Sequence, residues 1–244
     1  MYGWRARIGI IYPASGLADH EYYEMAPEGV SIHIARSSVP HEGGVTLEDV
    51  LEVAGGEEFT KLARDLATVK PHCIAWMCTS GSFSRGVEWD RELIRIIEEA
   101  SGTKATTTSA SMVKALQALG VKRVACGTPY EPRVDAKLKE YLEEKGFQVV
   151  NIKGLNILTD WEIGSLGPEV AYNLAKEVDR PEAEAIFISD TGFRLIELVE
   201  LLEAELGKPV MSANMVTMWH ALRLSGIREP IDGLGRLFRT PSPE

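Results

Sequence analysis

Short apolar runs alternate along the chain with longer segments in which apolar residues recur every three or four positions. The runs have the length of buried strands, and they predict strands over 7–13, 30–36, 73–78, 103–109, 121–127, 147–152, 185–189 and 209–212. The segments between them have helical spacing, and they predict helices over 47–68 with a break at Gly55-Gly56, 89–100, 111–119, 133–145, 164–178, 193–205 and 214–224. Strands that alternate with helices in this way are typical of parallel sheets with right-handed crossovers. The tail from Pro230 to Glu244 is rich in glycine and proline, and its end is expected to be loosely held.

Two turns that follow predicted strands have similar sequences and carry polar groups. Cys78-Thr79-Ser80-Gly81 follows the apolar strand that begins at Cys73, and Asp190-Thr191-Gly192 follows the strand that begins at Ala185. In open α/β sheets, ligand sites form at the carboxyl ends of the strands. We therefore expect the two turns to face each other across one active site. The structural alternatives are a core thiol for Cys78 and a helix cap for Asp190.

The two turns belong to a wider internal repeat. Residues 5–13 resemble 121–129, and residues 109–113 resemble 212–216, with the two turns lying between these segments in the same order. The repeat predicts an α/β fold of two pseudo-symmetric lobes, each a parallel sheet flanked by helices, with the active site in the cleft between them. We expect 1–112 plus 214–244 to form the N-terminal lobe and 113–213 to form the C-terminal lobe.

Composition narrows the class of protein. The 244 residues are 45% apolar and 25% charged, which suits a soluble globule with a full core. The net charge is −10 and the basic residues are scattered, so we expect no nucleic-acid partner. No apolar run reaches the roughly 18–20 residues that span a bilayer, and the N-terminus lacks a signal-peptide pattern, so we expect no membrane partner and a cytoplasmic location. Three cysteines without metal-like spacing predict neither a disulfide framework nor a metal site.

Four motifs resemble those of the arylmalonate decarboxylase and maleate cis-trans isomerase family, which belongs to the aspartate/glutamate racemase superfamily. They are Met77-Cys78-Thr79-Ser80-Gly81-Ser82-Phe83, Thr128-Pro129-Tyr130, Ser189-Asp190-Thr191-Gly192 and Gly235-Arg236-Leu237-Phe238. The resemblance extends over nearly the whole chain. It implies a two-lobed α/β fold and carbon-acid chemistry on a small carboxylic acid without metal, flavin or pyridoxal phosphate.

The resemblance also implies a site for the substrate carboxylate. Thr79, Ser80 and Tyr130 match hydroxyls that hold this group in the decarboxylases, and the backbone N–H of Thr191 would join them. Pro13 and Ser15 lie at the end of the first strand and its turn. We expect them to complete the carboxylate site.

The two expected catalytic residues are Cys78 and Asp190. Cys78 matches the first of the two cysteines of the racemases and isomerases, a position that is glycine in the decarboxylase. Asp190 matches the second cysteine, which is the proton donor in the decarboxylase. Ala14-Ser15-Gly16 occupies the turn in which maleate isomerases carry an asparagine. The chain therefore departs from both patterns.

These residues favour a cofactor-independent enzyme resembling arylmalonate decarboxylase, in which hydroxyl and N–H donors hold an enediolate and Cys78 protonates it. We expect the thiol pKa to fall toward neutrality at a helix N-terminus, and burial to raise the pKa of Asp190. One alternative is a racemase or cis-trans isomerase that uses Cys78 and Asp190 on opposite faces of the substrate. A third reading is a non-catalytic carboxylate-binding protein. The sequence does not identify the substrate, and it is compatible with a homo-oligomer.

Overall fold

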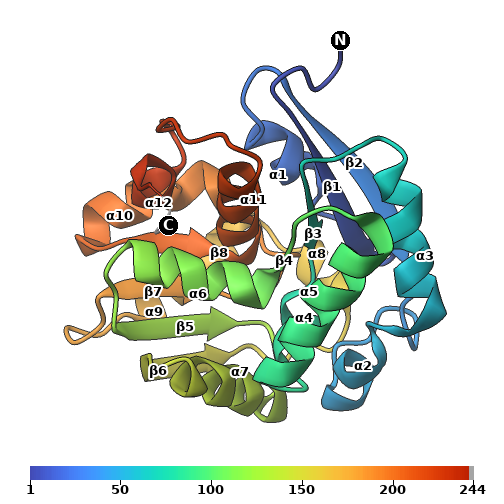
Figure 1. The fold of residues 1–244 in the computed structure, drawn as a ribbon. Coiled ribbons are helices and arrows are strands. Elements are labelled where there is room, and N and C mark those ends of the chain that lie inside the picture. The colour runs from blue at the N-terminus through green and yellow to red at the C-terminus, as the bar shows by residue number, and fades with distance from the viewer. Residues whose placement is uncertain (242–244) are drawn as a thin grey trace.

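The chain folds into two parallel four-stranded sheets of the same topology. The computed structural model describes residues 1–241. The first sheet has the order β2-β1-β3-β4, and the second has the order β6-β5-β7-β8 (Figure 1). The strands are β1 Ala6–Pro13, β2 Val30–Ser37, β3 Cys73–Trp76, β4 Ala105–Thr107, β5 Arg123–Thr128, β6 Gln148–Gly154, β7 Ala185–Ile188 and β8 Val210–Ser212. The expected α/β fold of two pseudo-symmetric lobes is confirmed.

Helices cover both sheets. The α-helices are α1 Asp19–Glu24, α2 Leu47–Glu52, α3 Gly56–Ala67, α4 Thr79–Phe83, α5 Val87–Ser101, α6 Thr108–Ala118, α7 Pro132–Glu144, α8 Asp160–Gly164, α9 Pro168–Val178, α10 Val199–Leu206, α11 Ala213–Leu224 and α12 Gly235–Arg239. A 3₁₀ turn, η1, covers Ile196–Leu198. Helices α3 and α5 pack on the first sheet, and α7, α9 and α10 pack on the second. Within residues 1–241, none of the helices has both the length and the apolarity needed to cross a bilayer.

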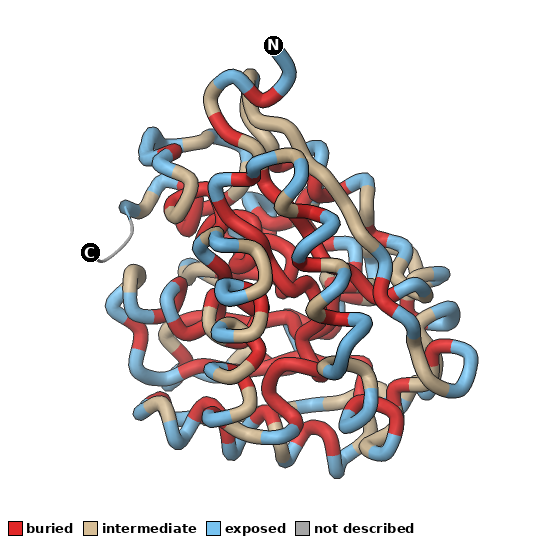
Figure 2. Tube along the Cα trace, turned by 45° about the vertical axis from the view of Figure 1, so that its right-hand side comes forward, coloured by how far each residue is buried: buried red, intermediate tan, exposed pale blue. Residues whose placement is uncertain are grey.

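The central strands are apolar throughout because helices cover them on both faces. Every residue of β3 and β7 is buried, which explains why these strands show no alternation of polar and apolar residues. Figure 2 shows this buried interior running through both lobes, with most exposed residues on the outer helices and loops. The strands' carboxyl ends, and the turns that follow them, are therefore fixed by a rigid core.

Helices α6 and α11 are equivalent in the repeat and pack against each other at the centre of the molecule (Figure 1). Each begins directly after the fourth strand of its sheet, with a capping hydroxyl at the same position: Thr107 accepts the N–H of Ala110, and Ser212 accepts the N–H of Met215. The Thr217 hydroxyl of α11 lies 3.1 Å from the Thr108 hydroxyl of α6. Helix α11 also contacts β1, β3 and β4 of the first sheet and β8 of the second.

Some elements differ from the sequence prediction. The helix predicted over 193–205 begins only at η1, so its predicted start is wrong. Its first turn is replaced by irregular chain, in which the buried Glu21 carboxylate accepts the N–H of Leu195. The tail holds the short helix α12, which packs on α10 and α11. The end of the tail expected to be loosely held includes residues 242–244, which lie outside the described residues.

Candidate active site

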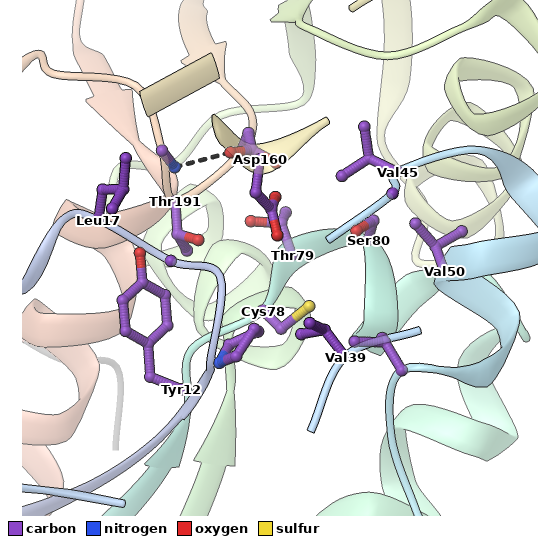
Figure 3. A pocket seen from close by; sticks show the side chains of 16 residues that line it. Tyr12, Leu17, Val39, Val45, Val50, Cys78, Thr79, Ser80, Asp160 and Thr191 are labelled. Carbon is purple, nitrogen blue, oxygen red and sulfur yellow. Dashed lines mark hydrogen bonds between the residues drawn. The ribbon is translucent and has the colours of Figure 1, made fainter. Parts of the chain in front are cut away.

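A pocket lies where the carboxyl ends of the two sheets meet (Figure 3). Both predicted turns line it, the first through Cys78 and the second through Asp190. The structure therefore brings together the two turns that the repeat placed opposite each other. The full lining consists of Tyr12, Pro13, Gly16, Leu17, Val39, Gly44, Val45, Val50, Val53, Cys78, Thr79, Ser80, Asp160, Asp190, Thr191 and Gly192.

Cys78 lies between strand β3 and the short helix α4. Its backbone is extended, with φ −151° and ψ 110°, and the side chain is 7% exposed. Burial raises the pKa of the thiol well above its ordinary value, and the nearby Asp160 and Asp190 raise it further. The expectation of a lowered thiol pKa is therefore wrong. Helix α4 has only five residues, so its dipole is too small to outweigh desolvation and two acidic neighbours. The surroundings of Cys78 therefore favour the protonated thiol over the thiolate.

Thr79 and Ser80 form the first turn of α4, and both line the pocket. The Thr79 side chain is 2% exposed, and its Oγ1 has no hydrogen-bond partner among the described residues. Buried hydroxyls are almost always hydrogen-bonded. An unpaired hydroxyl aimed into a pocket therefore points to a ligand that pairs with it.

Asp190 follows β7 with an unusual backbone conformation. Its φ is +88°, a region that side chains other than glycine rarely adopt. The carboxylate stabilises this turn by accepting the N–H of Gly192 at 2.7 Å, and it also accepts the hydroxyl of Tyr130. Burial raises the pKa of Asp190, as expected from the sequence. The carboxylate therefore forms a turn and does not cap the following helix.

Asp160 is a second acidic residue in the pocket, and the sequence analysis missed it. It is the first residue of α8, and its carboxylate accepts the hydroxyl of Ser15. Burial, together with the charge of Asp190, raises the pKa of Asp160 to about 7. The two carboxyl groups thus interact, and near neutral pH the pair tends to retain a proton. Asp160 does not lie in a turn directly after a strand, since β6 ends at Gly154. Its sequence position therefore does not mark it as a site residue.

The remaining predicted residues lie at different depths. Pro13 and Thr191 line the pocket, and the Thr191 side chain is hydrogen-bonded to Tyr12. Tyr130 is fully buried behind Asp190, and its hydroxyl also lies 3.4 Å from the Ser189 hydroxyl. Ser15 is one step removed from the lining and orients Asp160. Direct contacts of Tyr130 and Ser15 with substrate stay predictions.

Two chain segments, 43–45 and 158–160, are hydrogen-bonded to each other beside the pocket and join the two lobes. We call this pair of segments the strap. Gly44, in the loop after β2, forms an antiparallel bridge with Thr159, and the N–H of Val45 donates to the carbonyl of Leu158 at 3.0 Å. The N–H of Asp160 donates to the carbonyl of Gly43 at 2.9 Å. These bonds position Asp160 over the turn of Cys78. They also bring in an apolar wall, formed by Val39, Val45, Val50 and Val53.

The pocket combines hydroxyls, two carboxyl groups, a neutral thiol and an apolar wall. No Lys, Arg or His belongs to the lining that the described chain provides. Nor do residues 1–241 contain a group of three or more His, Cys, Asp or Glu side chains placed to hold a metal ion. Such an arrangement can hold a carboxylate by hydroxyls and N–H groups and move a proton to or from carbon.

Comparisons with known proteins identify the family of the chain. The arylmalonate decarboxylase family model matches residues 9–238. Arylmalonate decarboxylase from Bordetella bronchiseptica is 28% identical over 94% of this chain and 94% of its own length. Maleate isomerase from Nocardia farcinica is 28% identical over 97% of this chain and 96% of its own length.

Two solved structures show the same fold. A liganded double variant of arylmalonate decarboxylase, in which a glycine is replaced by cysteine and a cysteine by serine, has a TM-score of 0.85 at 30% identity, over 96% of this chain and 98% of that one. A maleate isomerase from Pseudomonas putida S16 with maleate has a TM-score of 0.89 at 22% identity, over 98% of this chain and 99% of that one. The chain therefore belongs to the arylmalonate decarboxylase family and is an enzyme of the lyase or isomerase type.

Proposed function

We propose that this enzyme removes carbon dioxide from a small malonate-type acid and protonates the resulting carbanion with the Cys78 thiol. The bond between the α-carbon and one carboxylate breaks, and its electron pair stays on the α-carbon as an enediolate. The S–H proton of Cys78 then passes to that carbon, and the thiolate regains a proton from solvent. The proposed reaction needs no cofactor, and its substrate is a small carboxylic acid.

The single observation that carries this proposal is the place of the Cys78 thiol, which is buried and lines the pocket. All three cysteines lie within the described residues, and Cys78 is the one that lines the pocket. Because burial raises its thiol pKa, it holds a proton to give, whereas addition to a double bond would need a thiolate. Cys73 and Cys126 lie in β3 and β5 and are fully buried. Three free thiols also suit a cytoplasmic enzyme.

The family relatives support the placement of a single thiol. By the family resemblance, Cys78 stands at a glycine of the decarboxylase and Asp190 at its proton-donating cysteine. The liganded decarboxylase variant also carries a new cysteine in place of a glycine and has lost a cysteine. We infer that proton delivery comes from the β3 side of the pocket, the side on which Cys78 lies.

The other polar groups supply the enediolate site. The unpaired Thr79 hydroxyl, the Ser80 hydroxyl and the N–H groups at the start of α4 are donors, and Thr191 lies across the pocket. Donors placed at developing negative oxygens typically lower a barrier by a few kcal/mol. The apolar wall of valines supplies a surface on which a carboxylate is poorly solvated. A carboxylate placed there is lost more readily as neutral carbon dioxide.

Incubation of the enzyme in deuterated water with phenylmalonate, methylmalonate, maleate and aspartate tests the reaction type. We expect a malonate to release carbon dioxide and to yield a product with one deuterium on the α-carbon. Hydration of maleate, its isomerisation, or α-exchange without carbon dioxide release would contradict decarboxylation.

Racemisation or epimerisation is the second candidate function, since Cys78 and Asp190 come from different lobes and line one pocket. Two proton carriers on opposite sides of a carbon are what such a reaction requires. This candidate predicts deuterium at the α-carbon of a monocarboxylic or amino acid, with loss of its optical activity and no carbon dioxide. Asp190→Asn would then abolish exchange starting from one enantiomer.

A further inference from the structure

Asp160 has no part in the reaction just proposed, although it lies in the pocket. Figure 3 shows it beside Thr79 and Thr191, on the side of the strap. One of its carboxyl oxygens accepts the Ser15 hydroxyl. Asp190, by contrast, is 5% exposed and accepts the Gly192 N–H of its own turn, whereas Asp160 is half-buried. Asp160 is therefore the carboxyl group more available to a ligand.

We propose that Asp160 selects substrates whose α-substituent carries a nitrogen with N–H donors, such as an amino or acylamino group on a malonate. This inference rests on the proposed function and names its substrate class. The acid's carboxylate would take the Thr79 and Ser80 hydroxyls, and its nitrogen would donate to Asp160. The unpaired Thr79 Oγ1 lines the same pocket and leaves a donor for an acceptor on the ligand at this end.

Charge balance supports this assignment. The lining from the described residues contains two carboxyl groups and no cationic side chain, and a malonate brings two negative charges. An ammonium group on the substrate offsets part of this repulsion. A hydrocarbon substituent would instead cover Asp160 with carbon and leave the carboxyl oxygen that Ser15 does not reach without a donor, which is costly. The apolar wall of valines can contact the departing carboxylate whether the α-substituent carries nitrogen or is a hydrocarbon.

Binding to a variant that lacks the catalytic thiol tests the inference directly. In Cys78→Ser, we compare the dissociation constants of aminomalonate, acetamidomalonate and methylmalonate by calorimetry, first with Asp160 and then with Asp160→Leu, whose side chain has a similar shape and no acceptor. Loss of a hydrogen bond to a charged group corresponds to roughly a tenfold to hundredfold change in affinity. We expect at least a tenfold preference for a nitrogen-bearing ligand, and we expect Asp160→Leu to remove that preference. Aminomalonate preferred over acetamidomalonate indicates recognition of the charge, and equal affinities indicate recognition of the N–H.

The matched control is Glu162→Gln, which removes one exposed negative charge from the same helix outside the pocket. It should leave the preference unchanged. Equal affinities for all three ligands, or a preference that survives Asp160→Leu, would overturn the inference. Turnover by the enzyme with Cys78 present separates this result from the proposed function. Carbon dioxide release with equal affinities refutes the inference alone, whereas a nitrogen preference without carbon dioxide release refutes decarboxylation alone.

Discussion

Cys78 and Asp190 occupy equivalent positions in the two lobes, yet their turns differ. The chain at Cys78 stays extended and leads straight into α4, whereas Asp190 has a φ of +88° and is followed by irregular chain up to η1. The Asp190 carboxylate holds its own turn through the Gly192 N–H. The repeat therefore preserves the place of the two residues, and the side chain at each place determines the local geometry.

The neutral state of Cys78 makes a prediction about pH. A proton donor works while it is protonated, and burial raises the thiol pKa above its ordinary value of 9.0. The turnover number for carbon dioxide release should therefore not fall with the ionisation of Cys78 between about pH 7 and pH 9. Rate measurements in overlapping buffers check this. A decline centred below pH 8, abolished in a thiol-free variant, would indicate a lowered pKa and contradict the account.

Part of the site was predictable from local sequence. Cys78, Thr79, Ser80, Asp190 and Thr191 follow strands directly, so strand-end reasoning found them. Asp160 was missed because its position depends on hydrogen bonds between loops over a hundred residues apart. The thiol pKa was predicted in the wrong direction, because burial depth is a property of the packed fold.

At the scale of elements, the apolar wall of the pocket depends on how helix α2 begins. Thr46 caps this helix in a reciprocal arrangement, in which its hydroxyl accepts the N–H of Asp49 and its own N–H donates to the Asp49 carboxylate. Helix α2 carries Val50, and Val53 is its C-terminal cap, so both valines of the pocket wall depend on it. The cap therefore links local helix stability to the shape of the site.

Thr46→Ala should lower the free energy of unfolding by about 1 kcal/mol, because the capping hydroxyl is lost. It should also raise KM more than it lowers the turnover number, since the wall loosens while the thiol stays in place. Urea titration and steady-state kinetics measure the two effects. Thr60→Ala, within α3, is the control and should change stability by less than about 0.5 kcal/mol. An unchanged KM for Thr46→Ala would show that the cap of α2 does not affect substrate binding, and it would contradict this prediction.

Most long elements followed from hydrophobic periodicity, because each buries a single face or is buried completely. The short helices α1, α4, α8 and α12 were not predicted, since five or six residues carry too little periodic signal. The predicted start of the helix over 193–205 was wrong because a distant carboxylate, Glu21, binds the chain there. The second error is a tertiary contact overriding local preference.

At the scale of the whole molecule, a buried hydrogen bond joins the lobes away from the pocket. The Tyr141 hydroxyl of α7 donates to the Asp90 carboxylate of α5 at 2.7 Å, and Asp90 also accepts the Thr107 hydroxyl. Asp90 and Tyr141 are 2% and 1% exposed. With the packed helices α6 and α11, this bond fixes the relative position of the two turns that form the site.

Tyr141→Phe should lower the free energy of unfolding by about 1–2 kcal/mol, because it leaves a buried carboxylate oxygen without its donor. Denaturant titration monitored by fluorescence and by circular dichroism measures this, and the two signals should change together. Tyr172→Phe is the matched control, since its hydroxyl pairs with the surface residue Glu205. A Tyr141→Phe stability equal to that of the unaltered enzyme would show that the bond does not couple the lobes.

The most direct test of the account compares carbon dioxide release by Cys78→Ser and Cys126→Ser on whichever malonate the unaltered enzyme turns over. The first variant removes the pocket thiol, and the second removes a thiol buried in β5. Loss of a proton donor typically costs about 10²- to 10⁴-fold in rate. We predict a fall of at least roughly a hundredfold in kcat for Cys78→Ser and, with the fold intact, near-normal turnover for Cys126→Ser. A folded Cys78→Ser enzyme that retains full turnover would contradict the central claim.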